Sequence, residues 1–457
     1  MLPLTGIEVL TGGVHGRPFS AALVDLEQLG YQQREYVVSG TAESYRPVGD
    51  LRFDGRWAVE PVDTASFRTR ILVTAPVDPH RFNGTVMAEW NNVSVGFEIL
   101  AADAPELFEL GFVHVGISAQ YVGVHGHADS PTGLTAWDPE RYASLSHPGD
   151  RYSYDIFRQC ARLVGPQRPT DGLDPLQGLA VQDLIAVGHS QSAGRLASYL
   201  NAIAPRERVF DAAMLVTYFG AGASIDSDAL FDAREIDPNV PRQFPAGTRL
   251  RDDLGIPIMV VNSETEVLPS VMVRQRDSER FRWWEAAGTA HANVPVMAVI
   301  MGKVRRDGLS MPVPAEVGDI PPMCAVSWKP VLIAAMVHLQ RWLRGGPAPP
   351  TQPLIEVAGD PPALVRDEHG IARGGIRLPD VEVPLAAHTG HNGLNGMMIL
   401  NGASVPFSAD VVRQLYRDKQ HYLDRYDRAL KQAVDAGVIL PISAEKLRAQ
   451  AERTSAY

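Results

Sequence analysis

The sequence predicts an α/β fold in which a mostly parallel sheet is covered by helices on both faces. Short apolar runs of strand length alternate with helix-like segments over residues 30–345, which is the pattern of buried parallel strands joined by crossover helices. Near the N-terminus, polar and β-branched residues alternate, which indicates a partly exposed sheet. Hydrophobic residues make up 45% of the chain and charged residues 21%, so disorder and coiled coil are excluded for the whole chain.

The individual elements follow from the period and the length of each run. Alternation predicts partly exposed strands at 34–39 and 68–74, and short apolar runs predict strands buried on both faces. Longer segments with an apolar stripe predict helices. The predicted buried strands are 84–90, 112–118, 184–188, 211–217, 257–262 and 280–287, and the predicted helices are 98–109, 154–164, 193–202 and 331–343.

Two segments fall outside this alternation. Residues 221–254 carry acidic residues and prolines without a clear period, and a long irregular insertion of this kind is usually a lid, a binding loop or a disordered segment. Residues 346–457 form a proline-rich extension that leads to a long helix whose apolar stripe runs over 412–434, with Gly437 as its C-cap. We expect this extension to dock on the α/β core of residues 30–345.

Charge and composition narrow the classes of function. The chain of 457 residues has 42 Lys and Arg against 53 Asp and Glu, a net charge of −11, so we expect no broad nucleic-acid surface. Two cysteines cannot build a disulfide framework or a four-cysteine zinc site. The N-terminus has no signal-peptide pattern, and no stretch reaches the ~18 apolar residues of a membrane span. The sequence therefore predicts a soluble cytoplasmic protein.

The strongest motif surrounds Ser190. An apolar strand leads into Gly188-His-Ser190, and a helix begins at once, which is the layout of a nucleophile elbow. The helix N-terminus would stabilise negative charge, and the Gln191 amide would point at a developing oxyanion. Ser192 stands where glycine is commonest at this motif, but serine is small enough for the turn. The alternative is a serine that only caps a helix.

An acid and a histidine follow in the order that a Ser–acid–His triad requires. Glu264 and Glu266 come just after the predicted strand 257–262, and Glu266 has the preferred offset from the strand end. His291 follows the next strand on a loop of small residues, and an imidazole can take a serine proton near neutral pH. The alternatives are solvated loop glutamates and a loop histidine that is only hydrogen-bonded.

The second oxyanion donor should come from the loop after strand 84–90, where the Asn91 or Asn92 amide is the candidate. The alternative is a polar turn that only caps the sheet. The residues His125, His127 and Asp129 could be interpreted as metal ligands, but two histidines at this spacing without a supporting cluster are weak evidence. We therefore expect no metal and no organic cofactor.

These motifs together resemble the α/β-hydrolase superfamily, and more narrowly the bacterial alpha/beta hydrolase domain-containing proteins. The resemblance covers most of the chain. It implies that Ser190, His291 and either Glu264 or Glu266 form a triad, and that the protein is a serine esterase with an acyl-enzyme intermediate. It specifies no substrate. The segments that carry it are 35–42, 89–92, 154–157, 188–195, 263–266, 288–291, 374–384 and the C-terminal helix.

The sequence thus predicts a serine hydrolase that acts on a carboxylic ester, a lactone or a related small acyl compound. An acyltransferase would use the same triad and differ only in the acceptor of the acyl group. A non-catalytic binding protein with a hydrolase fold is the remaining alternative, against which the ordered triad argues. An exposed edge strand or the C-terminal helix could support a homodimer.

Overall fold

The computed structural model describes residues 6–100, 104–127, 132–169, 171–228, 247–310, 320–394 and 396–454. Its contacts divide the chain into two compact units. Unit 1 comprises Met1–Ile258 and Met301–Pro312, and unit 2 comprises Met259–Ile300 and Val313–Tyr457. Helix α8 (Val294–Asp307) begins in unit 2 and ends in unit 1. Each unit is described below by itself.

The strands of unit 1 combine an antiparallel and a parallel region. Their order is β1-β2-β3-β5-β4-β6-β7. The pairs β1–β2, β2–β3 and β3–β5 are antiparallel. The pairs β5–β4, β4–β6 and β6–β7 are parallel. The parallel strands are buried along their whole length, as their apolar sequences predict. The bounds are β1 (Gly6–Leu10), β2 (Tyr31–Pro47), β3 (Val59–Pro76), β4 (Thr85–Trp90), β5 (Val113–Ile117), β6 (Asp183–His189) and β7 (Ala212–Val216).

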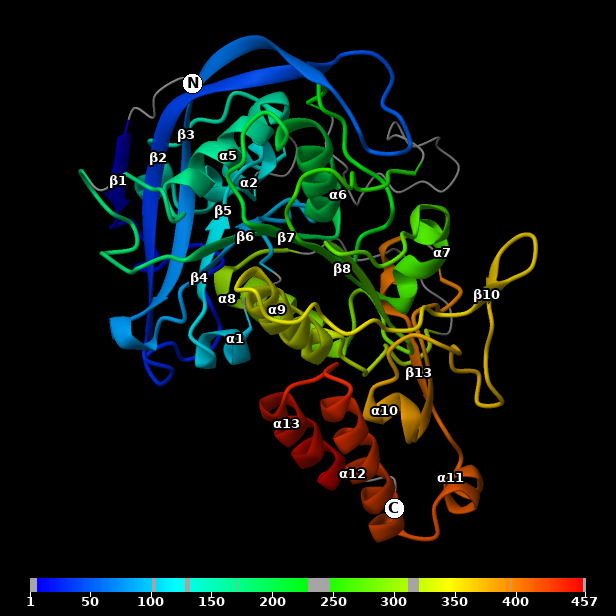
Figure 1. The fold of residues 1–457 in the computed structure, drawn as a ribbon. Helices are drawn as coiled ribbons and strands as arrows, with labels where there is room; N and C mark the ends of the chain where they lie inside the picture. The colour runs from blue at the N-terminus through cyan, green and yellow to red at the C-terminus, as the bar shows by residue number, and fades with distance from the viewer. Residues whose placement is uncertain are drawn as a thin grey trace. The chain divides into compact units, whose positions relative to one another are not determined.

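Helices α5 and α6 of unit 1 lie close together against the parallel strands (Figure 1). Trp90 of β4 packs on Phe157 of α5 with ring centroids 4.7 Å apart, and Phe157 in turn contacts Tyr199 just after α6. This aromatic layer is fully buried and fixes both helices to one face of the sheet. The helices are α1 (Pro105–Glu109), α2 (Tyr121–His125), α3 (Leu134–Trp137), α4 (Pro139–Tyr142), α5 (Ser153–Arg162) and α6 (Gln191–Ser198).

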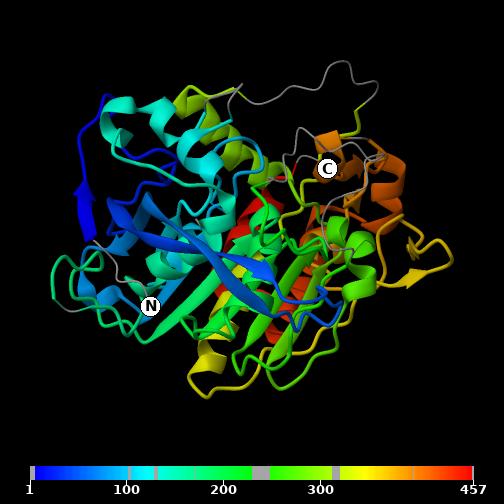
Figure 2. The same ribbon diagram turned by 90° about the horizontal axis from the view of Figure 1, so that it is seen from above.

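Three predicted elements of unit 1 differ markedly in length from the structure. Strands β2 and β3, predicted as 34–39 and 68–74, form a much longer hairpin, seen as the blue pair in Figure 2. The helix predicted over 98–109 begins only at Pro105, as α1. Ile99 instead pairs with Asn92, so residues before 101 belong to the loop after β4, and proline favours the first turn of the helix.

Unit 2 contains the last two strands of the α/β pattern and most of the C-terminal helices. Strands β8 and β9 are neighbours, and the chain at Ile376 pairs with Glu285 and Ala287 at β9. No helix within the described ranges is long and apolar enough to span a membrane. The elements are β8 (Ile258–Ser263), α7 (Val267–Ser270), β9 (Phe281–Ala286), α9 (Lys329–Leu343), β10 (Val357–Ala358), β11 (Ala363–Leu364), α10 (Pro379–Glu382), β12 (Ala386–Thr389), β13 (Ala403–Pro406), α11 (Ala409–Leu415), α12 (Lys419–Asp435) and α13 (Pro441–Glu452).

In the C-terminal extension, the single long helix predicted from the apolar stripe over 412–434 is two helices, α11 and α12, and α13 follows them. The predicted stripe is interrupted between α11 and α12, because Asp418 caps a new helix by accepting from the His421 amide. Gly437 ends α12 with a φ of 71°, as predicted. Its carbonyl accepts from His338 of α9 at 2.8 Å, and α12 lies beside α13 in Figure 1.

The predicted α/β class is confirmed, with helices packed on a sheet that contains a parallel region. Of the predicted insertion 221–254, residues 229–246 lie outside the described residues. The flanking parts 221–228 and 247–254 contain no helix or strand.

Candidate active site

Ser190 occupies a sharp turn between β6 and α6 in unit 1. Its φ of 59° and ψ of −117° lie in a region that residues other than glycine rarely adopt. Backbone conformations of this kind cost about 1–3 kcal/mol and occur at functional sites. A Cβ atom at Gly188 would lie 2.6 Å from the Ser192 carbonyl oxygen, so only glycine fits two residues before the serine. The local sequence therefore builds the predicted elbow.

Ser192 has a structural use at the position where glycine is commonest. Its fully buried hydroxyl accepts from the His189 amide at 2.9 Å and donates to the His189 carbonyl at 3.0 Å. These bonds tie the first turn of α6 back to the last residue of β6. The Ser190 amide donates to the Val216 carbonyl of β7 at 2.9 Å. The departure from glycine thus adds hydrogen bonds to the elbow instead of disturbing it.

The loop after β4 lies against the elbow, but its amides are used differently from the prediction. The Asn91 and Asn92 backbone amides both donate within the fold, to the Ile117 and Ile99 carbonyls at 3.1 Å. The Asn92 side-chain amide donates to the His189 carbonyl at 2.8 Å and so holds the loop on the elbow. The next backbone amide, that of Val93, faces the Gln191 side-chain oxygen at 3.5 Å.

Of the predicted oxyanion donors, the Gln191 backbone amide remains the candidate beside Ser190. Gln191 is the first residue of α6, where backbone N–H groups have no partner within the helix. The Val93 amide donates to the Gln191 side-chain oxygen, so it is engaged within the fold, as the Asn91 and Asn92 amides are. Sequence reasoning missed the engagement of the Asn92 amide because its pairing with Ile99 is a contact that no local pattern reveals.

In unit 2, Glu266 and His291 form a buried pair. The Nδ1 atom of His291 lies 2.7 Å from Oε1 of Glu266, and the two residues are 5% and 0% exposed. The other carboxylate oxygen of Glu266 accepts from the amide and the hydroxyl of Ser263, at 2.8 and 2.6 Å. A carboxylate only accepts hydrogen bonds, so Nδ1 carries the proton and Nε2 is left as the basic nitrogen.

The loop that carries His291 is fixed by bonds to its backbone. The His291 amide donates to the Thr265 hydroxyl at 3.1 Å, and the indole of Trp328 donates to the His291 carbonyl at 3.2 Å. Thr265 in turn donates to the Gly390 carbonyl at 2.8 Å. The imidazole is therefore held from both sides in one orientation toward Glu266.

Glu264, the other candidate acid, is bound elsewhere. Its carboxylate accepts from the Gly288 and Gly390 amides at 2.8 and 3.1 Å, and from Thr389 and Arg366 at 2.9 Å. With four donors and no exposed surface, it joins the start of the His291 loop to the C-terminal extension. Of the two glutamates, Glu266 is thus the one that the structure brings to His291.

The other polar candidates have structural surroundings. His125 accepts from the His147 amide at 3.0 Å, and burial lowers the pKa of His125. Asp129 lies outside the described residues. Within the described ranges, no group of three or more His, Cys, Asp and Glu residues could hold a metal ion. Both cysteines are buried thiols, and burial raises the pKa of Cys324 to about 11.

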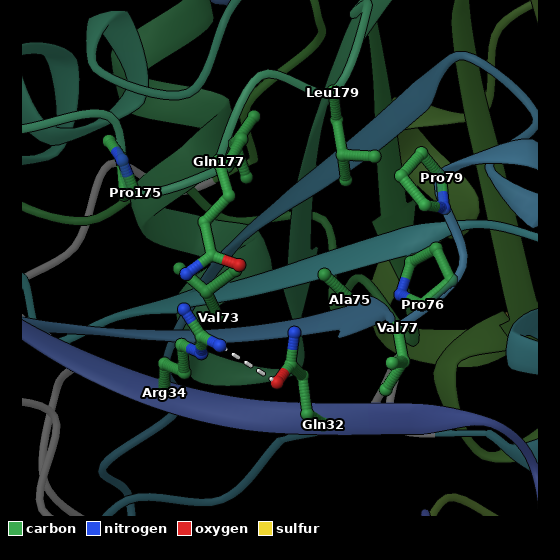
Figure 3. Close-up of a pocket in the computed structure, with 11 residues that line it drawn as sticks. Gln32, Arg34, Val73, Ala75, Pro76, Val77, Pro79, Pro175, Gln177 and Leu179 are labelled. Carbon is green, nitrogen blue, oxygen red and sulfur yellow. Dashed lines mark hydrogen bonds between the residues drawn. The ribbon is translucent and has the colours of Figure 1, made fainter.

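Figure 3 shows a pocket of unit 1. It is lined by eleven residues, among them Gln32, Arg34, Val73 and Leu179, and the Arg34 guanidinium donates to Gln32 at 3.0 Å. Its β3 residues run past the start of β5, whereas Ser190 follows the end of the parallel strand β6. The pocket contains none of the predicted site residues.

The predicted site residues fall into two groups. Ser190, Gln191, Asn91 and Asn92 belong to unit 1, and Glu264, Glu266 and His291 belong to unit 2.

A family model described as "Alpha/beta hydrolase domain" matches residues 4–449, which is nearly the whole chain. The chain belongs to this alpha/beta hydrolase domain family. The resemblance stated from the sequence motifs is therefore confirmed.

Solved structures with some similarity to this alpha/beta hydrolase domain protein include several esterases. The esterase Est22 is 10% identical, with a TM-score of 0.32, over 62% of this chain and 81% of that chain. An acetyl xylan esterase from Paenibacillus sp. R4 is 12% identical, with a TM-score of 0.30, over 67% and 90%. XC6422 from Xanthomonas campestris, an a/b serine hydrolase without lid, is 14% identical, with a TM-score of 0.28, over 60% and 97%. The comparison with curated proteins found no match. The family assignment rests on the family model alone.

Proposed function

We propose that this protein is a serine hydrolase that cleaves a carboxylic ester, a lactone or a related acyl compound. The observation that carries the proposal is the backbone of Ser190, whose φ of 59° at a strand-to-helix junction is that of a nucleophile elbow. The buried pair of His291 and Glu266 supports it, because an imidazole oriented by a carboxylate is the general base that such a serine requires.

The proposed reaction proceeds through an acyl-enzyme. The Ser190 hydroxyl attacks the carbonyl carbon while Nε2 of His291 takes its proton, and the carbonyl oxygen becomes an oxyanion. His291 then returns the proton to the leaving alcohol, which departs and leaves an ester on Ser190. Water attacks that ester with His291 again as the base, so that the carboxylic acid is released and the serine hydroxyl is restored. Glu266 stabilises the imidazolium at both stages.

The backbone amide of Gln191 is the proposed oxyanion donor. Each donor that meets an oxyanion is typically worth ~10²–10³ in rate. In this proposal the Asn92 side chain holds the loop after β4 on the elbow. The start of α6 adds a favourable field for negative charge at the same point.

The test is the hydrolysis of short-chain p-nitrophenyl esters by the wild-type protein and two serine variants. We expect Ser190→Ala to lower kcat by at least ~10³-fold, since it removes the nucleophile. The matched control is Ser198→Ala, which removes another buried hydroxyl of α6, one that donates to the Ala223 carbonyl and not to the elbow. A Ser190→Ala variant that hydrolyses esters as fast as Ser198→Ala would contradict the proposal.

A further inference from the structure

Behind the elbow, a chain of buried polar side chains connects Gln191 to Asp150. The Gln191 side-chain amide donates to Oε1 of Gln120 at 3.0 Å, and the Gln120 side-chain amide donates to Asp150 at 2.9 Å. Gln191 is 9% exposed, Gln120 is fully buried and Asp150 is 2% exposed. The catalytic steps proposed above make no use of Gln120 or Asp150.

Asp150 fixes the direction of this chain. Its carboxylate also accepts from Arg195 at 2.9 Å and from the Tyr121 amide at 2.7 Å, so both oxygens are engaged by donors. A carboxylate paired with a guanidinium can only accept. Gln120 must therefore turn its NH2 group toward Asp150 and its oxygen toward Gln191.

The orientation of Gln120 sets that of Gln191 in turn. The Gln120 oxygen accepts from both Gln191 and the Trp90 indole, each at 3.0 Å. The NH2 group of Gln191 is thereby held on Gln120, and its oxygen is left to face the Val93 amide at 3.5 Å. A reversed Gln191 would place two donors against each other at Val93.

We propose that Asp150 and Gln120 are positioning residues for the proposed oxyanion donor, the Gln191 backbone amide. The relay from Asp150 through Gln120 holds the Gln191 side chain, whose oxygen accepts from the Val93 amide and so joins the start of α6 to the loop after β4. Gln191, and with it its backbone amide, is thereby held in one place beside Ser190. This inference rests on the proposed function, because the relay can act on catalysis only if Ser190 attacks a substrate and an oxyanion forms.

A variant that breaks the relay without breaking the ion pair gives the direct test. Gln120→Met keeps a side chain of similar length and leaves Asp150 paired with Arg195, but it cannot orient Gln191. Asp150→Asn replaces the acceptor that fixes the orientation of the Gln120 amide. It also leaves the buried Arg195 without its anion, and breaking a buried ion pair lowers stability. Gln120→Met is therefore the primary variant, and Asp150→Glu tests for rescue because it keeps the charge.

Gln159→Met is the matched control. Gln159 is also a buried glutamine that donates to the carboxylate of a buried Asp–Arg pair, Asp155 with Arg158, at 2.9 Å. Its side-chain amide also donates to the Thr41 carbonyl, and among the described residues no hydrogen bond joins it to Gln191. The two methionine variants therefore lose a similar bond at similar burial, and their comparison separates a loss of stability from a loss of positioning.

The experiment measures kcat and KM for a p-nitrophenyl ester and the affinity for phenylboronic acid, which forms a tetrahedral anion on a serine hydroxyl. We expect Gln120→Met to lower kcat by ~10-fold or more, a fraction of the loss of a whole donor, with KM within about twofold. Its boronate affinity should fall in parallel, Asp150→Glu should retain more activity than Asp150→Asn, and Gln159→Met should match the wild type. If Gln120→Met and Gln159→Met have the same kcat and the same boronate affinity, this inference is wrong but the proposed function stands. A wild-type protein that neither hydrolyses the ester nor binds the boronate would overturn the proposed function and this inference with it.

Discussion

The surroundings of Ser190 in unit 1 and those of His291 in unit 2 are built in different ways. Around Ser190, the fixing contacts come from residues a few positions away, such as Gly188 and Ser192, and from the loop after the neighbouring strand β4. Around His291, they come from distant parts of the chain, such as Arg366 and Gly390, which reach the loop through Glu264. A local motif can therefore specify the turn at Ser190, whereas the surroundings of His291 depend on the C-terminal extension.

The largest expected effect tests the two glutamates directly. Glu266→Gln should lower kcat by about 10³–10⁴-fold, because a neutral amide neither fixes the tautomer of His291 nor stabilises its imidazolium. The fold should persist, since the amide oxygen can still accept from Ser263. Steady-state ester hydrolysis, together with circular dichroism of the same sample, measures both. Activity within tenfold of wild type would exclude Glu266 as the triad acid.

Glu264→Gln should show the opposite behaviour. It leaves Arg366 facing a neutral group and disturbs the bonds to Gly288 and Gly390, and breaking a buried ion pair costs about 3–5 kcal/mol. Because Arg366 is partly exposed, we expect the loss to lie at about 3 kcal/mol or below. Urea unfolding gives this value, and kcat of the folded fraction should stay within about tenfold of wild type. A larger loss of kcat than in Glu266→Gln would reverse our assignment of the two residues.

A third prediction concerns His388, which packs beside Gly288 at the start of the His291 loop. Burial lowers the pKa of His388 to about 4, from its usual value of 6.5. The unfolded chain therefore binds this proton more readily, and stability falls as the pH is lowered from about 6.5 to about 4, by roughly 1.4 kcal/mol per pH unit. Relative to His388→Gln, the wild type should lose about 2 kcal/mol more between pH 6.5 and pH 5. Parallel losses in urea unfolding of the two proteins would show that His388 does not carry this dependence.

The smallest effect concerns the elbow itself. Ser192→Ala removes two hydrogen bonds to His189 and should cost about 1 kcal/mol of unfolding free energy. Ser192→Gly should cost somewhat more, because glycine also raises the entropy of the unfolded chain. Thermal unfolding of both variants measures this difference. A higher melting temperature in either variant than in the wild type would contradict the structural role that we assign to Ser192.

The sequence predicted the features that depend on local patterns. The strand–turn–helix at Ser190, the order of acid and histidine, and the buried strands all follow from period and spacing. The choice between Glu264 and Glu266 needed the structure, because the two side chains are separated by one residue and differ only in their distant partners. The relay through Gln120 and Asp150, and the contact of Gln191 with Val93, could not be found, since they join residues far apart in the sequence. The break before Asp418 was missed because the apolar stripe continues across it.

The most direct test of the central claim is covalent labelling with a fluorophosphonate, followed by peptide mapping of the full chain. The probe reacts with a serine activated by a base and stabilised by oxyanion donors. The account predicts one adduct per chain, on Ser190, and none in Ser190→Ala. An adduct on another serine, or ester hydrolysis by a chain that takes no label at Ser190, would contradict the account.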